Sequence, residues 1–150
     1  MDVAGLDRLI DEYDSEHGGI VALLQDVQAA EAYLPRPALE RIAERLGLPL
    51  SQLYGLATFY KAFSLRPKGR HTVTCCLGTA CHVRGGQQVV ARLERELGVQ
   101  PGETTPDMKF TLETVNCLGA CALGPLVVVD GKYHGRITAA KVARLLEQYE

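Results

Sequence analysis

Five cysteines in two groups constrain this 150-residue chain more than any other feature of its sequence. Cys75, Cys76 and Cys81 form the first group, and Cys117 and Cys121 form the second. The N-terminal residues show no basic segment followed by an apolar one, so we expect no secretory signal and a cytoplasmic location. Cysteines in that compartment serve metal binding or redox chemistry more often than disulfide frameworks.

Several classes of protein are excluded at this point. The chain has 16 basic and 18 acidic side chains, a balance that argues against nucleic-acid binding by phosphate neutralisation. The longest charge-free run, residues 114–129, is shorter than the roughly 18–20 apolar residues of a membrane span. No C-x-x-C motif occurs, so the sequence does not support a thioredoxin-type exchange site. None of the histidines follows a cysteine in the C-x-H pattern of a Rieske centre; they are His17, His71, His82 and His134.

Residues 1–68 are predicted to form a helical region. Apolar side chains recur there at spacings of three and four, the pattern of one helix face. The three stripes are Leu6, Leu9, Ile10 and Tyr13, then Ile20, Leu23, Leu24 and Val27, and then Leu39, Ile42, Ala43 and Leu46. A short fourth helix is expected to carry Leu53, Tyr54 and Ala57.

Glycine, proline and serine predict where these helices begin and end. We expect the first helix to end at Gly18-Gly19, and the second to stop before Pro35. Pro37 suits the first turn of the third helix, which Gly47 ends. Ser51 is the expected N-cap of the fourth helix.

Residues 69–150, after a linker at residues 66–69, are predicted to form a small α/β domain. Residues 72–75 and 108–114 alternate polar and apolar side chains, as half-buried strands do, and the second strand is expected to turn Thr111 to solvent. Asp130-Gly131 between two short strands predicts a hairpin. The two expected helices carry Val89, Val90, Leu93 and Leu97, ended by Gly98, and Val142, Leu145, Leu146 and Tyr149, capped by Thr138.

Both cysteine groups come where a predicted strand runs out into a loop, and the first of these loops is a glycine-rich turn. Because strand ends in one sheet lie close together, the two loops can converge on one site. Cys76 and Cys81 are spaced C-x₄-C, and Cys117 and Cys121 are spaced C-x₃-C. Four thiolates in two pairs form the ligand set of a [2Fe–2S] cluster. The three glycines expected to bring backbone N–H groups to the sulfurs through positive φ angles are Gly78, Gly119 and Gly124.

Two alternatives remain open from the spacing. Four cysteines can also hold one zinc ion, although a zinc ribbon typically uses C-x-x-C pairs and these loops are wider. Cys75 points to the same strand face as Val73, so we interpret it as a small buried apolar residue. The alternative is that Cys75, rather than Cys76, is a ligand.

The cysteine motifs resemble a known family. TCCLGTACHVRGG at residues 74–86 and NCLGAC at residues 116–121 are similar to the thioredoxin-like [2Fe–2S] subunit of NADH dehydrogenases. YLP at residues 33–35 and LYGLATFY at residues 53–60 resemble its helical N-terminal region. The resemblance covers nearly the whole chain. It implies an N-terminal helical bundle at residues 1–68 and a thioredoxin-like [2Fe–2S] ferredoxin domain at residues 69–150, with the cluster on Cys76, Cys81, Cys117 and Cys121.

The resemblance also implies a function and partners. This chain would be a non-catalytic electron-transfer subunit beside a flavoprotein subunit that binds FMN and NAD(H), together with further iron–sulfur subunits. Such subunits occur in respiratory complex I, in soluble NAD(P)-linked hydrogenases, some of them electron-bifurcating, and in NAD-dependent formate dehydrogenases. GTACHVRG at residues 78–85 is more similar to the soluble hydrogenase type. The alternatives are the corresponding subunit of complex I and a zinc-stabilised interaction module without a redox role.

Residues outside the cysteine pairs are open to functional and structural interpretations. His82 and Arg84 are either solvated loop residues or groups that stabilise the reduced cluster. His71 and His134 are interpreted as ordinary surface residues. The aromatic run Phe59-Tyr60 and Phe63 is interpreted as core or interdomain packing. We expect the four N-terminal helices to form much of the docking surface for the flavoprotein.

Overall fold

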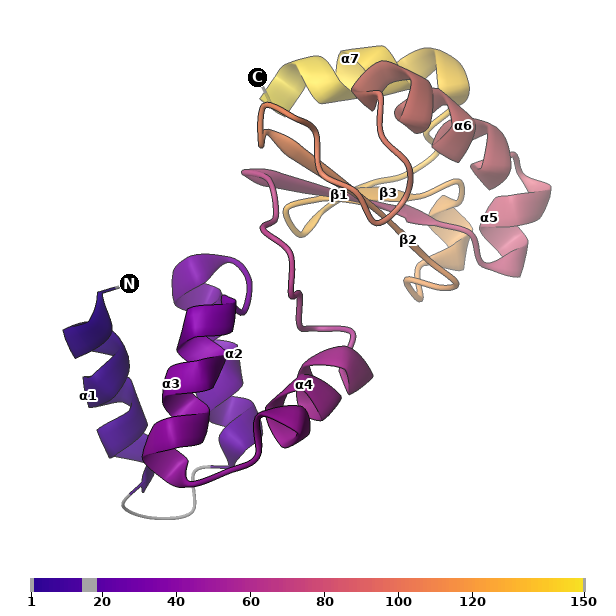
Figure 1. The fold of residues 1–150 in the computed structure, drawn as a ribbon. Coiled ribbons are helices and arrows are strands. Elements are labelled where there is room, and N and C mark those ends of the chain that lie inside the picture. Colours follow the sequence, from indigo (N-terminus) through magenta and orange to yellow (C-terminus); the bar gives the residue numbers. More distant parts are fainter. Residues whose placement is uncertain (1, 15–18, 150) are drawn as a thin grey trace. The chain divides into compact units, whose positions relative to one another are not determined.

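The computed structural model of the chain describes residues 2–14 and 19–149, which form two compact units. The units are Met1–Pro67 and Lys68–Glu150, drawn in indigo to magenta and in magenta to yellow in Figure 1. The linker expected at residues 66–69 contains this division. Each unit has a hydrophobic core of its own.

The described residues of the first unit form four helices, as the apolar periodicity predicts. They are α1 (Val3–Asp14), α2 (Ile20–Glu31), α3 (Arg36–Leu46) and α4 (Leu50–Phe59). The predicted stripes face inward and form one core, whose most deeply buried members are Ile10, Leu23, Leu24, Val27, Leu34, Leu39, Ile42 and Leu53. The N-terminal helical bundle is therefore confirmed.

The helix ends agree with the sequence in part. Pro37 lies in the first turn of α3, and Gly47 ends that helix with φ 63°. Ser51 is not the N-cap of α4, because the extended conformation of Pro49 leads directly into a helix that begins at Leu50. Ser51 therefore lies inside the first turn. The end expected at Gly18-Gly19 falls partly outside the described residues.

An ion pair joins α1 to α3. The guanidinium of Arg41 donates two parallel hydrogen bonds to the carboxylate of Asp7, each 3.0 Å long. Arg45 approaches the same carboxylate at 3.4 Å. The hydrogen bonds from Arg41 lower the pKa of Asp7, because they stabilise its ionised form.

The second unit is built on a mixed sheet with the order β2-β1-β3-β4. The strands are β1 (His71–Cys76), β2 (Phe110–Val115), β3 (Val127–Val129) and β4 (Lys132–His134). Strand β1 pairs with β2 in parallel and with β3 antiparallel. Asp130 and Gly131 have φ angles of 50° and 81° and form the predicted hairpin turn.

Helices α6 (Gly86–Leu97) and α7 (Val142–Leu146) lie beside each other on one side of this sheet (Figure 1). Together they bury the apolar face of the strands; the core includes Val73, Cys75, Val89, Val90, Leu93, Leu112, Val127, Val129, Val142 and Leu145. Gly98 ends α6, as predicted. Thr138 makes no side-chain cap bond, because a 3₁₀ turn at Ala139–Lys141 precedes α7. That predicted cap is wrong.

The strand expected at residues 108–114 is shorter than predicted, and one side chain has the wrong environment. Met108 has a φ of 57° and lies outside β2. Thr111 is buried, because its hydroxyl accepts a hydrogen bond from the Gly69 N–H at 2.7 Å and pairs with the Thr104 hydroxyl at 2.8 Å. The face expected to be wet is thus covered there by neighbouring loops. Across the described part of the chain, no helix has the length and apolar character needed to cross a membrane.

The Asp7–Arg41 pair predicts a pH-dependent contribution to stability. Because the pKa of Asp7 is lowered in the fold, its contribution is present above the unfolded pKa of about 4 and is lost as the pH falls through the folded value. Asp7→Asn should therefore be less stable than the natural sequence at pH 7, and the difference should shrink toward pH 2. Urea unfolding followed by helical circular dichroism measures both. The exposed Glu12→Gln serves as control, and a pH-independent deficit for Asp7→Asn would contradict this account.

Candidate metal centre

The two cysteine loops leave the sheet at the same edge. Strands β1 and β2 are parallel neighbours, and their last residues, Cys76 and Val115, are register partners. Cys117 therefore follows only two residues beyond the point where Cys76 ends its strand. The convergence predicted from the sequence is confirmed.

The loops also touch each other closely. A Cβ atom placed on Gly78 would lie 2.2 Å from the carbonyl oxygen of Asn116, so only glycine fits where the first loop crosses the second. A Cβ atom on Gly124 would lie 3.1 Å from the sulfur of Cys81. These two contacts join the segment that carries one cysteine pair to the segment that carries the other.

The four cysteines form two pairs with different exposure. Cys76 and Cys81 are 3% and 2% exposed and pack with Leu126, whereas Cys117 and Cys121 are exposed. Burial and the interaction with Cys76 raise the pKa of Cys81. The interaction with Cys117 raises the pKa of Cys121. Cys81 thus interacts most strongly with the thiol of Cys76, and Cys121 with that of Cys117.

Backbone N–H groups point at these sulfurs. Gly119, with φ 79°, donates its N–H to the sulfur of Cys117 at 3.3 Å. The N–H of Leu126 interacts with the Cys81 thiol and opposes the increase in its pKa. Positive φ is needed only at Gly119, because Gly78 and Gly124 have φ angles of −56° and −60°. Those two glycines serve close approach, which corrects the mechanism expected for them.

The pairwise arrangement fits a two-iron cluster better than a single ion. A zinc ion would draw all four sulfurs into one tetrahedron about 2.3 Å from the metal. The two thiol pairs are close enough to influence each other electrostatically, since Cys76 contributes to the raised pKa of Cys121. Such a pair of pairs supplies two thiolates for each iron of a [2Fe–2S] cluster.

Cys75 lies on the other side of the sheet from this site. Its side chain is fully buried in the core beside Val73, as predicted from the strand alternation. Burial raises its pKa to about 12, so it remains a neutral thiol. Cys76, the next residue, packs instead with Cys81 and Leu126.

The other side chains singled out in the sequence have different surroundings. His71 and His134 are not ordinary surface residues: His71 bonds to Asp130 at 2.5 Å, and His134 bonds to the hydroxyl of Tyr149 at 2.8 Å. Burial lowers the pKa of His134. Their partners lie 59 and 15 residues away in sequence, so no local sequence pattern predicts these two hydrogen bonds. His82 is exposed, and His17 lies outside the described residues.

The aromatic run divides between core and surface. Phe63 is buried in the helical core, whereas Phe59 is 79% exposed. Core packing is therefore the wrong interpretation for Phe59. Tyr60 lies between the two and stacks edge-on against both rings.

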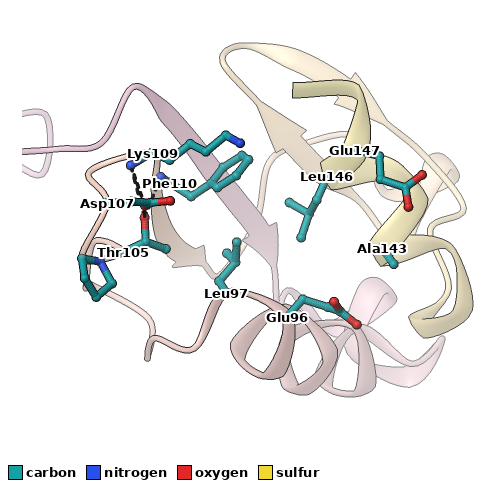
Figure 2. Close-up of a pocket in the computed structure, with 10 residues that line it drawn as sticks. Glu96, Leu97, Thr105, Asp107, Lys109, Phe110, Ala143, Leu146 and Glu147 are labelled. Carbon is teal, nitrogen blue, oxygen red and sulfur yellow. Dashed lines mark hydrogen bonds between the residues drawn. The ribbon is translucent and has the colours of Figure 1, made fainter. Parts of the chain in front are cut away.

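A surface hollow of about 500 Å³ lies between the end of α6, the segment before β2 and α7 (Figure 2). Leu97 and Leu146 form part of its apolar wall, and Asp107 is held by the N–H of Lys109 at 3.0 Å. Phe110, another lining residue, starts the strand whose far end leads to the second cysteine loop. The hollow therefore lies roughly a strand length, about 17 Å, from that loop, and no cysteine lines it.

A family model for thioredoxin-like [2Fe–2S] ferredoxins matches residues 6–150, which includes both cysteine loops and nearly all of the helical unit. The chain belongs to this family. The resemblance drawn from the cysteine motifs is confirmed, and the cofactor of the family is a [2Fe–2S] cluster.

Relatives of this ferredoxin-family chain are components of oxidoreductases. It is 35% identical over 142 residues to HndA, a component of the NADP-reducing hydrogenase of Solidesulfovibrio fructosivorans, covering 95% of this chain and 83% of the relative. It is 40% identical over 137 residues to a component of the NADH-quinone oxidoreductase of Rhizobium meliloti, covering 91% and 82%. The corresponding component of the Escherichia coli K12 enzyme is 37% identical over 138 residues, covering 92% and 83%.

A solved structure shares the fold. The NAD⁺-reducing [NiFe]-hydrogenase in its air-oxidised state superimposes with a TM-score of 0.70 and 24% identity. The match covers 84% of this chain but 22% of the hydrogenase chain, so the ferredoxin-family chain corresponds to only part of that larger polypeptide. The predicted fold, helices followed by a thioredoxin-like ferredoxin domain, is confirmed by the family match and by the observed sheet.

The crossing at Gly78 predicts a strict requirement for glycine. Gly78→Ala should destabilise the domain by roughly 1–3 kcal/mol, because the new methyl group overlaps a backbone oxygen that cannot move without shifting the second loop. Thermal unfolding and the iron content of the purified protein measure the two effects. Gly55→Ala in α4 is the matched control: nothing lies within 4 Å of its Cβ position, so it should be neutral or stabilising. Equal behaviour of the two variants would contradict the crossing.

Proposed function

We propose that this chain is an electron-transfer subunit of a cytoplasmic NAD(P)H oxidoreductase complex and carries one [2Fe–2S] cluster on Cys76, Cys81, Cys117 and Cys121. The observation that carries the proposal is the arrangement of these thiols in two adjoining pairs at the shared edge of β1 and β2. When bound, the cluster takes up and releases one electron at a time. The chain itself performs no bond chemistry and acts as an electron carrier.

The environment of the site suits an anionic redox group. A [2Fe–2S] centre with four thiolates carries about −2 when oxidised and about −3 when reduced. Residues 76–86 and 116–125 contain no carboxylate, although the chain has 18 acidic residues. The N–H groups of Gly119 and Leu126 add partial positive charge beside the sulfurs. Both features lower the free-energy cost of adding an electron.

The proposed partner is a flavoprotein subunit that binds FMN and NAD(H), with further iron–sulfur subunits in the same complex. The names of the relatives support this, because they are components of multisubunit hydrogenases and NADH dehydrogenases. We favour a soluble NAD(P)-linked hydrogenase, the electron-bifurcating kind included, or a formate dehydrogenase, on the motif GTACHVRG at residues 78–85. The second candidate is the same component of NADH-quinone oxidoreductase, supported by the 40% identity to the Rhizobium meliloti relative.

The helical unit is the proposed docking element for the flavoprotein. Phe59 at the end of α4 is a large apolar side chain with 79% of its surface exposed. Aromatic side chains are the commonest strong anchors in protein interfaces. The hydrophobic core of the helical unit does not include Phe59, so this side chain is not needed to fold the unit.

The ligand assignment predicts a sharp contrast between neighbouring cysteines. The natural chain, purified without oxygen, should be brown, with about two iron and two sulfide ions per chain. Replacing Cys76, Cys81, Cys117 or Cys121 by Ser should alter or abolish the visible absorbance, because each change removes a thiolate ligand. Cys75→Ser should leave the spectrum unchanged.

Cys75→Ser is the matched control, since it changes the adjacent residue and places a hydroxyl in the core of the same domain. Loss of the spectrum in that variant, with retention in Cys76→Ser, would move the ligand to Cys75. A colourless natural protein that contains one zinc ion would instead identify the chain as a zinc-stabilised module.

The docking proposal predicts a strong effect of one exposed ring. Phe59→Ser should weaken binding of the flavoprotein by about 2 kcal/mol, a roughly thirtyfold increase in Kd, while the cluster spectrum remains unchanged. Deleting residues 1–65 should abolish complex formation. Val3→Ser is the control, because Val3 is also an exposed apolar residue of the helical unit. Normal complex formation by the deletion variant would refute the docking role, as measured by co-purification and by titration.

A further inference from the structure

We infer that Arg84 raises the reduction potential of the cluster, and that its hydrogen bond to the second cysteine loop holds its guanidinium in position to do so. This inference rests on the proposed function, because it presumes that a cluster is bound by the two cysteine pairs.

Arg84 follows the short helix α5 (Thr79–Val83), which lies where the sequence predicts only a glycine-rich turn. Cys81 lies in this helix and is buried, and Arg84 follows directly as its C-cap. From there the Nη1 of Arg84 donates a hydrogen bond to the carbonyl oxygen of Cys121 at 2.9 Å. One side chain thus connects the segment of the buried pair to a cysteine of the exposed pair, across 37 residues of sequence.

The bond determines where the positive charge lies. A free arginine on an exposed helix end samples many rotamers, and its charge is solvated away from any one site. The hydrogen bond to the backbone of Cys121 keeps the guanidinium beside the pair that faces solvent. The guanidinium of Arg84 bonds to a backbone carbonyl, whereas three other guanidinium groups pair with carboxylates, those of Arg41, Arg45 and Arg92.

The two cysteine segments themselves supply no carboxylate to neutralise this charge. Neither cysteine segment, residues 76–86 or 116–125, contains an aspartate or glutamate. The guanidinium of Arg84 therefore faces a site whose negative charge increases by one when the cluster is reduced. Coulomb attraction stabilises the reduced form more than the oxidised form, which raises the potential.

The test compares variants of the full chain with the cluster bound. Arg84→Gln removes the charge, and Arg84→Lys keeps it. The potential is measured by titration with dithionite at low ionic strength, followed by visible absorbance. Arg84→Gln should shift the ratio of reduced to oxidised cluster about tenfold toward the oxidised form at a given solution potential, a decrease of about 59 mV for a one-electron couple. Arg84→Lys should stay closer to the natural chain than to Arg84→Gln.

The control is Arg95→Gln, which removes an exposed arginine from α6 that makes no bond to either cysteine loop in the described structure; its potential should be unchanged. A second variant keeps the test decisive if Arg84→Gln loses its cluster. In Arg84→His the potential should fall, relative to the natural chain, as the pH rises from about 5.5 to about 8 and the imidazole loses its charge.

Two results would overturn the inference: a natural potential in Arg84→Gln, or equal decreases in Arg84→Gln and Arg84→Lys, which would indicate loop geometry rather than charge. If Arg84→Gln holds no cluster, a pH-independent difference between Arg84→His and the natural chain would overturn it as well. A natural chain that binds no cluster would contradict the proposed function itself, so the two failures are distinguishable.

Discussion

The parallel pairing of β1 with β2 is the interaction on which the rest of the site depends. Six register partners, from His71 with Phe110 to Cys76 with Val115, bring two distant segments to the same edge of the sheet. Parallel neighbours need a crossover connection, and α6 supplies it while covering the sheet with Val89, Val90 and Leu93. The packing that stabilises the domain therefore also determines how far apart the two cysteine loops can lie. A change in the register of β2 by one residue would turn its buried side chains to the opposite face and separate the loops.

Period-two alternation explains why four of the five cysteines lie at the candidate site and one does not. Cys75 and Cys76 are adjacent on β1, so their side chains leave the strand on opposite faces. One enters the core below α6 and α7, and the other faces Cys81 and Leu126. The same geometry explains their different chemistry. Full burial raises the pKa of the Cys75 thiol and keeps it protonated, whereas Cys76 packs with Cys81 and Leu126 where the two cysteine loops meet.

Local periodicity was enough to predict most elements but not the contacts between them. The stripes that include Ile10, Leu24 and Leu93 each repeat over a helix of 12 residues, long enough for the pattern to be distinct. Helix α5 has five residues, too few for any repeat, so its sequence indicated only a glycine-rich turn. The caps expected at Ser51 and Thr138 are wrong because α4 begins at Leu50, directly after Pro49, and a 3₁₀ turn at Ala139–Lys141 precedes α7.

The candidate site shows the same division. The spacing of the cysteines and their place after strands are sufficient to predict that the loops converge, because the C-terminal ends of neighbouring parallel strands lie close together. The bond from Arg84 to Cys121 and the fit of Gly78 against Asn116 depend on how two loops pack, 37 or 38 residues apart in the chain. A single sequence carries no periodic pattern for such a contact.

The unequal exposure of the two cysteine pairs also depends on how the loops pack, so the sequence does not predict it. A cluster of charge about −2 to −3 that was buried on every side would suffer a large loss of hydration. In the proposed site, the buried Cys76 and Cys81 would anchor the cluster in the fold, and the exposed Cys117 and Cys121 would leave one side of it hydrated.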